Sequence, residues 1–161
     1  MTANIEMQLR TWFLGAKKVV VAGIGNPIRL DDKVGLIIVD GLRCKVADRV
    51  LLLECETVPE SYFPEIERFR PTHVLLIDAA FMGLKPGEAN LVDAEKLVAS
   101  TAISSHIMPL KIFCSYVRQA TNAKIALLLV EPKSMDFGEG LSSEVHEAAE
   151  KYMDILISLL Q

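Results

Sequence analysis

Four short apolar runs constrain the fold of this chain more than any other feature of its sequence. They lie within residues 17–24, 49–54, 72–78 and 124–130. Runs of this length are typical of β-strands, and near-continuous apolar character is typical of strands covered on both faces, as in a parallel sheet. We therefore expect these segments to form the buried strands of one mostly parallel sheet.

The segments between the strands carry apolar residues at helical spacing. Helices are predicted over residues 32–43, 61–70, 110–120 and in the C-terminal segment that follows an N-cap at Ser142 or Ser143, and a short edge strand is predicted over 88–92. An amphipathic helix that ends near Gly15 precedes the first strand. This alternation of strands and helices predicts an α/β fold, a three-layer sandwich with a mostly parallel sheet.

Length and composition favour one globular domain. The chain has 161 residues, of which 51% are hydrophobic and 24% are charged. We expect a single domain over 1–161 in which residues 1–16 form an N-terminal extension helix. The net charge of −4 and the absence of any basic run longer than Lys17-Lys18 argue against a nucleic-acid partner.

The cysteines and the N-terminal segment bear on where the protein works. Cys44, Cys55 and Cys114 are scattered and form no C-x-x-C pair, so neither a structural zinc site nor a disulfide framework is expected. The first residues do not resemble a signal peptide, and no apolar run approaches the roughly 20 residues that span a bilayer. We expect a cytoplasmic protein that does not bind membranes.

The loop after the first apolar run contains two glycines and two acids. A dinucleotide motif G-x-G-x-x-G starting at Gly23 would need a third glycine where Ile28 stands, and Pro27 removes a backbone donor that could bind phosphate. The glycines could instead allow only a tight turn. One acid of Asp31-Asp32 suffices to cap the following helix, which leaves the second able to bind a cation.

Two further residues stand where strand-following loops would bring them to the same edge of the sheet. Asp78 directly follows the third apolar run, and His106 lies in a loop, whereas His73 and His146 are expected to be structural or at the surface. Binding crevices of parallel sheets lie beyond the carboxyl ends of the strands. Asp32, Asp78 and His106 together would suit a borderline divalent metal such as nickel or zinc and would leave coordination positions open.

The order of these motifs resembles that of the hydrogenase maturation endopeptidase family. The resemblance is carried by Gly23-x-Gly-Asn-Pro-x-x-x-Asp-Asp, by the aspartate after a hydrophobic strand, by the serine-rich loop with histidine, and by the segment Val130-Glu-Pro-Lys that leads toward the C-terminal helix. It covers the chain from about Lys18 to the end. The resemblance implies a twisted five-stranded sheet with helices on both faces.

The resemblance also implies an activity, a partner and a ligand set. The activity is removal of a short C-terminal peptide from the large-subunit precursor of a [NiFe]-hydrogenase once nickel is in place. The family's nickel ligands and catalytic residues correspond to Asp32, Asp78 and His106. The nickel is supplied by the substrate, no organic cofactor is expected, and a monomer is expected.

Three other functions share some of these sequence features. Peptidyl-tRNA hydrolase has a similar first loop, but its catalytic histidine follows shortly after, and residues 28–40 contain none. A nucleotide-binding module could use Glu54 or Glu56 to bind a ribose. A chaperone could sense nickel in the precursor without cutting it. Neither a serine nor a cysteine nucleophile is expected, because no acid is placed to orient a histidine beside Ser104 and Ser105, and Cys114 falls in a predicted helix.

Overall fold

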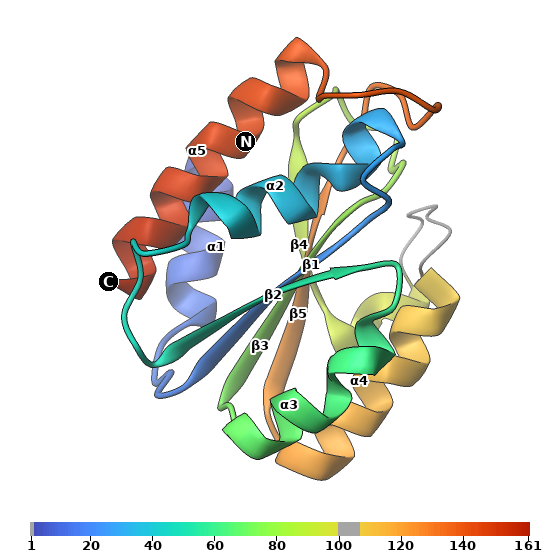
Figure 1. Cartoon of the computed structure of the whole chain (residues 1–161). Coiled ribbons are helices and arrows are strands. Elements are labelled where there is room, and N and C mark those ends of the chain that lie inside the picture. Colours follow the sequence, from blue (N-terminus) through green and yellow to red (C-terminus); the bar gives the residue numbers. More distant parts are fainter. Residues whose placement is uncertain (1, 100–106) are drawn as a thin grey trace.

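The computed structural model describes residues 2–99 and 107–161, which form one five-stranded sheet covered by helices (Figure 1). The strand order is β2-β1-β3-β5-β4. The strands are β1 Val19–Ile24, β2 Val50–Glu56, β3 His73–Ala79, β4 Ala89–Asp93 and β5 Lys124–Val130. The first three and β5 are parallel, and β4 pairs with β5 in antiparallel orientation at the edge. The predicted mostly parallel three-layer fold is confirmed.

The helices divide between the two faces of the sheet (Figure 1). One face carries α1 Thr2–Trp12, α2 Val34–Gly41 and α5 Ser143–Leu160, and the other carries α3 Phe63–Phe69 and α4 Ile107–Thr121. Short 3-10 helices η1 Leu30–Lys33 and η2 Pro59–Tyr62 precede α2 and α3, and η3 Ala94–Ala99 follows β4. The single helices predicted over 32–43 and 61–70 are therefore each divided in two, and η3 was not predicted.

Each face of the sheet has its own hydrophobic core, because successive strand residues point to opposite sides. Val19 and Val21 of β1 face the core that α1, α2 and α5 complete, whereas Val20 and Ala22 face the core of α3 and α4. All residues of β1 and β3 are buried. The continuous apolar runs therefore reflect strands that are covered on both faces.

The connections create a crevice between β1 and β3. The chain leaves β1 through α2 on one face to reach β2, and it leaves β2 through α3 on the opposite face to reach β3 on the other side of β1. Such a reversal of direction leaves a gap beyond the carboxyl ends of the two strands, where α/β proteins bind their ligands.

Glycines allow the start of α2 to lie directly on this edge. A Cβ atom at Gly35 would lie 2.2 Å from the carbonyl oxygen of Ile77 and 2.9 Å from that of Ile24. A Cβ atom at Gly23 would lie 2.4 Å from the carbonyl oxygen of Gly35, so the two backbones touch. The helix start therefore packs against the ends of both β1 and β3.

We predict that Gly35→Ala lowers the free energy of unfolding by about 1–3 kcal/mol, because the added methyl group overlaps strand backbone that cannot move aside. Gly41→Ala in the same helix is the matched control, since its Cβ would meet only the flexible side chain of Met153. Chemical denaturation of both variants measures the difference. Equal stabilities would contradict the proposed close packing at Gly35.

Candidate active site

The structure places both predicted carboxylates at the crevice between β1 and β3. Asp32 lies in η1, on the loop that follows β1, and Asp78 is the penultimate residue of β3. Their exposed fractions are 4% and 0%. Because the neighbouring Gly35 contacts the backbone of Ile77, the segment that carries Asp32 is held against the end of the strand that carries Asp78.

Backbone amides orient the two carboxylates. Asp32 Oδ2 accepts a hydrogen bond from the amide of Asn26 at 3.0 Å, and Asp78 Oδ1 accepts one from the amide of Ala79 at 2.8 Å. Both acids sit on rigid elements, which is the placement that a precise binding site requires. Buried negative charge concentrated at one crevice favours a cationic ligand, since carboxylates removed from water are stabilised by metals or other positive partners.

The third predicted ligand, His106, lies outside the described residues, and it directly precedes α4 in the sequence. Within residues 2–99 and 107–161, no group of three or more histidine, cysteine or acidic side chains is placed to hold a metal ion. The assignment of His106 as a ligand therefore stays a prediction.

Asp31 has a different role from the helix cap expected of an acid at this position. Neither η1 nor α2 has a side-chain hydrogen bond at its N-cap, so that expectation was wrong. The buried Asp31 carboxylate instead accepts four hydrogen bonds from the segment after β5: from the amides of Lys133 (2.8 Å), Ser134 (3.2 Å) and Ser142 (2.7 Å), and from the Ser142 hydroxyl (2.8 Å).

These bonds join the loop after β1 to residues 131–142, which we call the C-terminal loop. Leu30 donates its amide to the carbonyl of Gly138 at 3.3 Å, and the amide of Gly138 donates to Ile28 at 2.9 Å. Arg29 Nε donates to the carbonyl of Met135 at 3.0 Å. Ser142 is the N-cap of α5, as predicted, but its hydroxyl bonds Asp31 rather than the helix. The two loops thus form one wall of the site.

Glu131 organises the loop after Asp78, a role that the sequence analysis missed. Its carboxylate is buried, and Oε1 accepts hydrogen bonds from the amides of Met82 at 2.7 Å and Leu84 at 3.2 Å. The available signal was its position, because Glu131 directly follows the buried strand β5 just as Asp32 and Asp78 stand at or after the ends of β1 and β3.

The cysteines of the core are poor candidates for a nucleophile. Burial raises the pKa of Cys55 and of Cys114 to about 12, so neither thiol forms the reactive thiolate near neutral pH. Cys44 is exposed, but it follows α2 and precedes β2, toward the amino ends of the strands, whereas Asp78 lies at their carboxyl ends. These positions support the expectation that the chain is not a cysteine protease.

The two described histidines have structural or surface positions, as predicted. His73 is buried at the start of β3, where burial and the nearby Lys124 lower the pKa of its ring. His146 is exposed on α5 and lies 3.2 Å from the carboxylate of Glu150. His73 lies at the opposite end of β3 from Asp78, and the side chain of His146 is paired with Glu150 in the next turn of α5.

The amides of the glycine loop are not arranged to bind phosphate. The amide of Gly25 donates to the carbonyl of Glu56 at 2.8 Å, that of Asn26 donates to Asp32, and that of Ile28 donates to Asn26 Oδ1 at 3.1 Å. The adjacent buried carboxylates would also repel an anion. The loop geometry therefore argues against the nucleotide-binding alternative.

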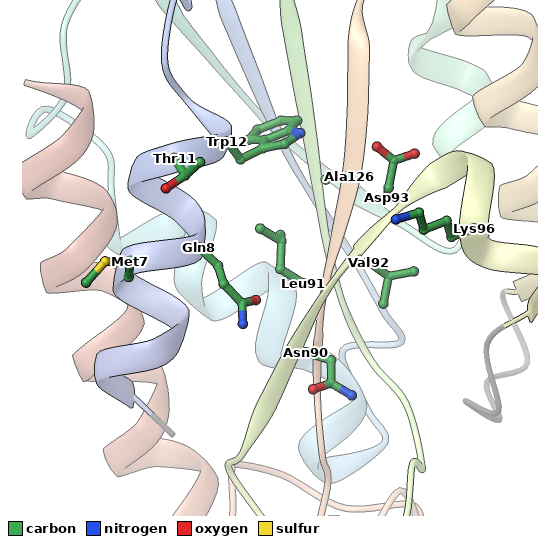
Figure 2. A pocket seen from close by; sticks show the side chains of 10 residues that line it. All are labelled: Met7, Gln8, Thr11, Trp12, Asn90, Leu91, Val92, Asp93, Lys96 and Ala126. Atoms are coloured by element: carbon green, nitrogen blue, oxygen red, sulfur yellow. The ribbon is translucent and has the colours of Figure 1, made fainter.

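A separate concavity of about 610 Å³ lies between α1 and the edge strand β4 (Figure 2). Figure 2 shows Gln8 and Trp12 of α1 on one side and Asn90 and Leu91 of β4 on the other. Its lining includes neither Asp32 nor any other acid of the crevice. This concavity is therefore distinct from the candidate site.

The fold and the crevice define a class of protein: a doubly wound α/β domain with two buried carboxylates at the point where the strand order reverses. No helix within the described part of the chain is long and apolar enough to cross a bilayer. Comparison with known proteins assigns the family.

A family model described as hydrogenase maturation protease, of the HycI type, matches residues 36–159. A protein of Methanocaldococcus jannaschii described as a hydrogenase maturation protease is 31% identical over 153 residues, which cover 90% of this chain and 89% of the relative. The hydrogenase 3 maturation protease of Escherichia coli is 24% identical over 131 residues, covering 81% and 83% of the two chains.

Solved structures agree with the sequence comparisons. The crystal structure of the [NiFe] hydrogenase maturation protease HycI from Thermococcus kodakarensis superposes with a TM-score of 0.88 at 33% identity, over 95% of this chain and 98% of that one. This chain belongs to the hydrogenase maturation protease family and is a peptide hydrolase.

We predict that Asp31→Asn loosens the wall formed by the C-terminal loop. An amide side chain cannot accept all four hydrogen bonds, and the loss of charged acceptors should lower the free energy of unfolding by roughly 3 kcal/mol. Thermal unfolding and hydrogen exchange of residues 133–142 measure the effect. Asp136 is an exposed acid in the same loop, and Asp136→Asn should change neither the thermal unfolding nor the hydrogen exchange. Hydrogen-exchange protection equal to wild type in Asp31→Asn would show that Asp31 does not hold the C-terminal loop in place.

Proposed function

We propose that this protein removes a C-terminal peptide from the nickel-loaded precursor of a [NiFe]-hydrogenase large subunit. We further propose that Asp32, Asp78 and His106 bind the nickel that the precursor carries. The observation that carries the proposal is the pair of buried carboxylates at the β1/β3 crevice of a chain that belongs to the maturation protease family. We expect the protein to act as a monomer in the cytoplasm.

The proposed ligand set fits this substrate. Carboxylates and imidazole bind borderline divalent metals, and three protein ligands leave positions that groups of the precursor can occupy. In this proposal the precursor's own cysteines hold the nickel, and the three side chains of the enzyme complete its coordination. The enzyme then needs no resident metal.

The chemistry that follows is hydrolysis of one peptide bond. The oxygen of a water molecule attacks the scissile carbonyl carbon, the C–N bond breaks, and a proton from the water passes to the departing amine. Nickel bound between enzyme and precursor positions the scissile segment and polarises its carbonyl or the attacking water. The poor nucleophilicity of Cys55 and Cys114 supports attack by water rather than by a thiolate.

The same arrangement would make cleavage depend on completed metal insertion. Without nickel, the precursor offers no cation to the buried carboxylates of Asp32 and Asp78, so it lacks its main anchor in the crevice. Nickel insertion would thus act as a checkpoint before the peptide is removed.

We predict that Asp32→Asn, Asp78→Asn and His106→Ala each lower the cleavage rate of nickel-loaded precursor more than about 100-fold, because each removes one metal ligand. Asp154→Asn, an exposed acid on α5, is the control and should cleave normally. Circular dichroism checks that each variant folds. Near-normal turnover in two of the three folded variants would show that the site is misplaced.

The nickel dependence is tested with the wild-type enzyme. Nickel-free precursor should remain uncut over a period in which nickel-loaded precursor is processed completely. Cleavage of both forms at the same rate would separate the protease activity from the proposed metal checkpoint.

A further inference from the structure

Most of the exposed large hydrophobic side chains lie in loops that follow strands or on α4. Four of them follow strand ends at the carboxyl edge: Ile28, Val58, Phe81 and Phe137. Two more, Ile112 and Tyr116, lie on α4 and are 58% and 61% exposed. Among the described residues, the remaining exposed large hydrophobic side chains are those of Met7 in α1 and Leu14 just after it. Single exposed apolar side chains are common on protein surfaces, so a binding surface is sought where several of them line one concavity.

The two α4 residues line a groove between α4 and the segment that follows β2. This α3–α4 groove, of about 500 Å³, is formed by Glu60, Phe63, Pro109, Ile112, Phe113 and Tyr116. The rings of Phe63 and Tyr116 pack edge to face with centroids 6.4 Å apart. Among the described residues of the lining, Glu60 is the only charged one, so the groove suits apolar side chains and disfavours acidic ones.

The groove adjoins the carboxyl edge because both of its walls begin there. The wall containing Glu60 and Phe63 follows the carboxyl end of β2, and α4 runs toward the start of β5 and therefore begins at the carboxyl edge (Figure 1). Pro109 stands three positions after His106 in the sequence. The groove therefore lies beside the same edge of the sheet as the crevice.

We infer that the α3–α4 groove binds apolar side chains of the precursor's C-terminal extension, the segment that is cut off; this inference rests on the proposed function. The loops that carry Ile28 and Phe137 present single exposed side chains, which suit contact with the folded body of a partner. The groove, in contrast, is a concavity of the size that accepts a few side chains of one extended segment. The enzyme then selects its substrate both by nickel and by an apolar residue at a set distance from the scissile bond.

The test compares Ile112→Asp with Leu14→Asp, a matched change at an exposed position outside the groove. With nickel-loaded precursor, Ile112→Asp should raise KM about tenfold and leave kcat unchanged, whereas Leu14→Asp should behave as wild type. Because Ile112 is exposed, the substitution should not prevent folding, and circular dichroism checks this.

A second precursor identifies the occupant of the groove. In this precursor, the apolar residues of the C-terminal extension are replaced by serine. Its KM with wild-type enzyme should be about tenfold higher than that of the unchanged precursor. The replacement should add little to the KM measured with Ile112→Asp, because both changes remove the same contact. Independent, additive effects would place the extension elsewhere and overturn the inference, as would an unchanged KM for Ile112→Asp. Wild-type enzyme that fails to cut any precursor would instead contradict the proposed function.

Discussion

The close contact between the start of α2 and the ends of β1 and β3 is the constraint on which the crevice depends. The carbonyl oxygens of Ile24 and Ile77 lie where a Cβ of Gly35 would project, so only glycine allows the helix to approach so near. This contact sets the position of η1 and therefore of Asp32 relative to Asp78. The glycines of the first loop serve this packing rather than a phosphate cradle.

Acids at the carboxyl edge divide into two groups by their partners. Asp31 and Glu131 accept hydrogen bonds from amides of the loops around the crevice, and they hold the C-terminal loop and the loop after β3 in place. Asp32 and Asp78 each accept a hydrogen bond from a backbone amide at the crevice itself. The binding chemistry that we propose for Asp32 and Asp78 thus relies on neighbouring carboxylates whose role is to shape the loops.

Much of the fold was predictable because its strands are short, apolar and covered on both faces, a pattern that few other structures produce. The bounds of β5 were predicted to the residue, and β4 was correctly placed as an edge strand. The 3-10 segment η3 was missed, since a six-residue helix leaves little periodicity to detect.

The candidate site was only partly predictable. Asp32 and Asp78 could be placed at one edge because parallel strands end together. The position of Glu131 after β5 indicated a place at the carboxyl edge, but the hydrogen bonds of Asp31 and Glu131 could not be predicted. Most of these bonds are to backbone amides of distant loops, and backbone amides carry no sequence signal. The cap expected at Asp31 was wrong for the same reason, since local helix rules do not include a partner far along the chain.

The bond between Asp31 and Ser142 spans 111 residues of sequence. Consequently, the full set of Asp31 contacts in this wall can form only after residues up to Ser142 have been synthesised. A chain that stops just before Ser142 would contain every strand of the sheet but would lack two of the four hydrogen bonds that hold Asp31 to the C-terminal loop.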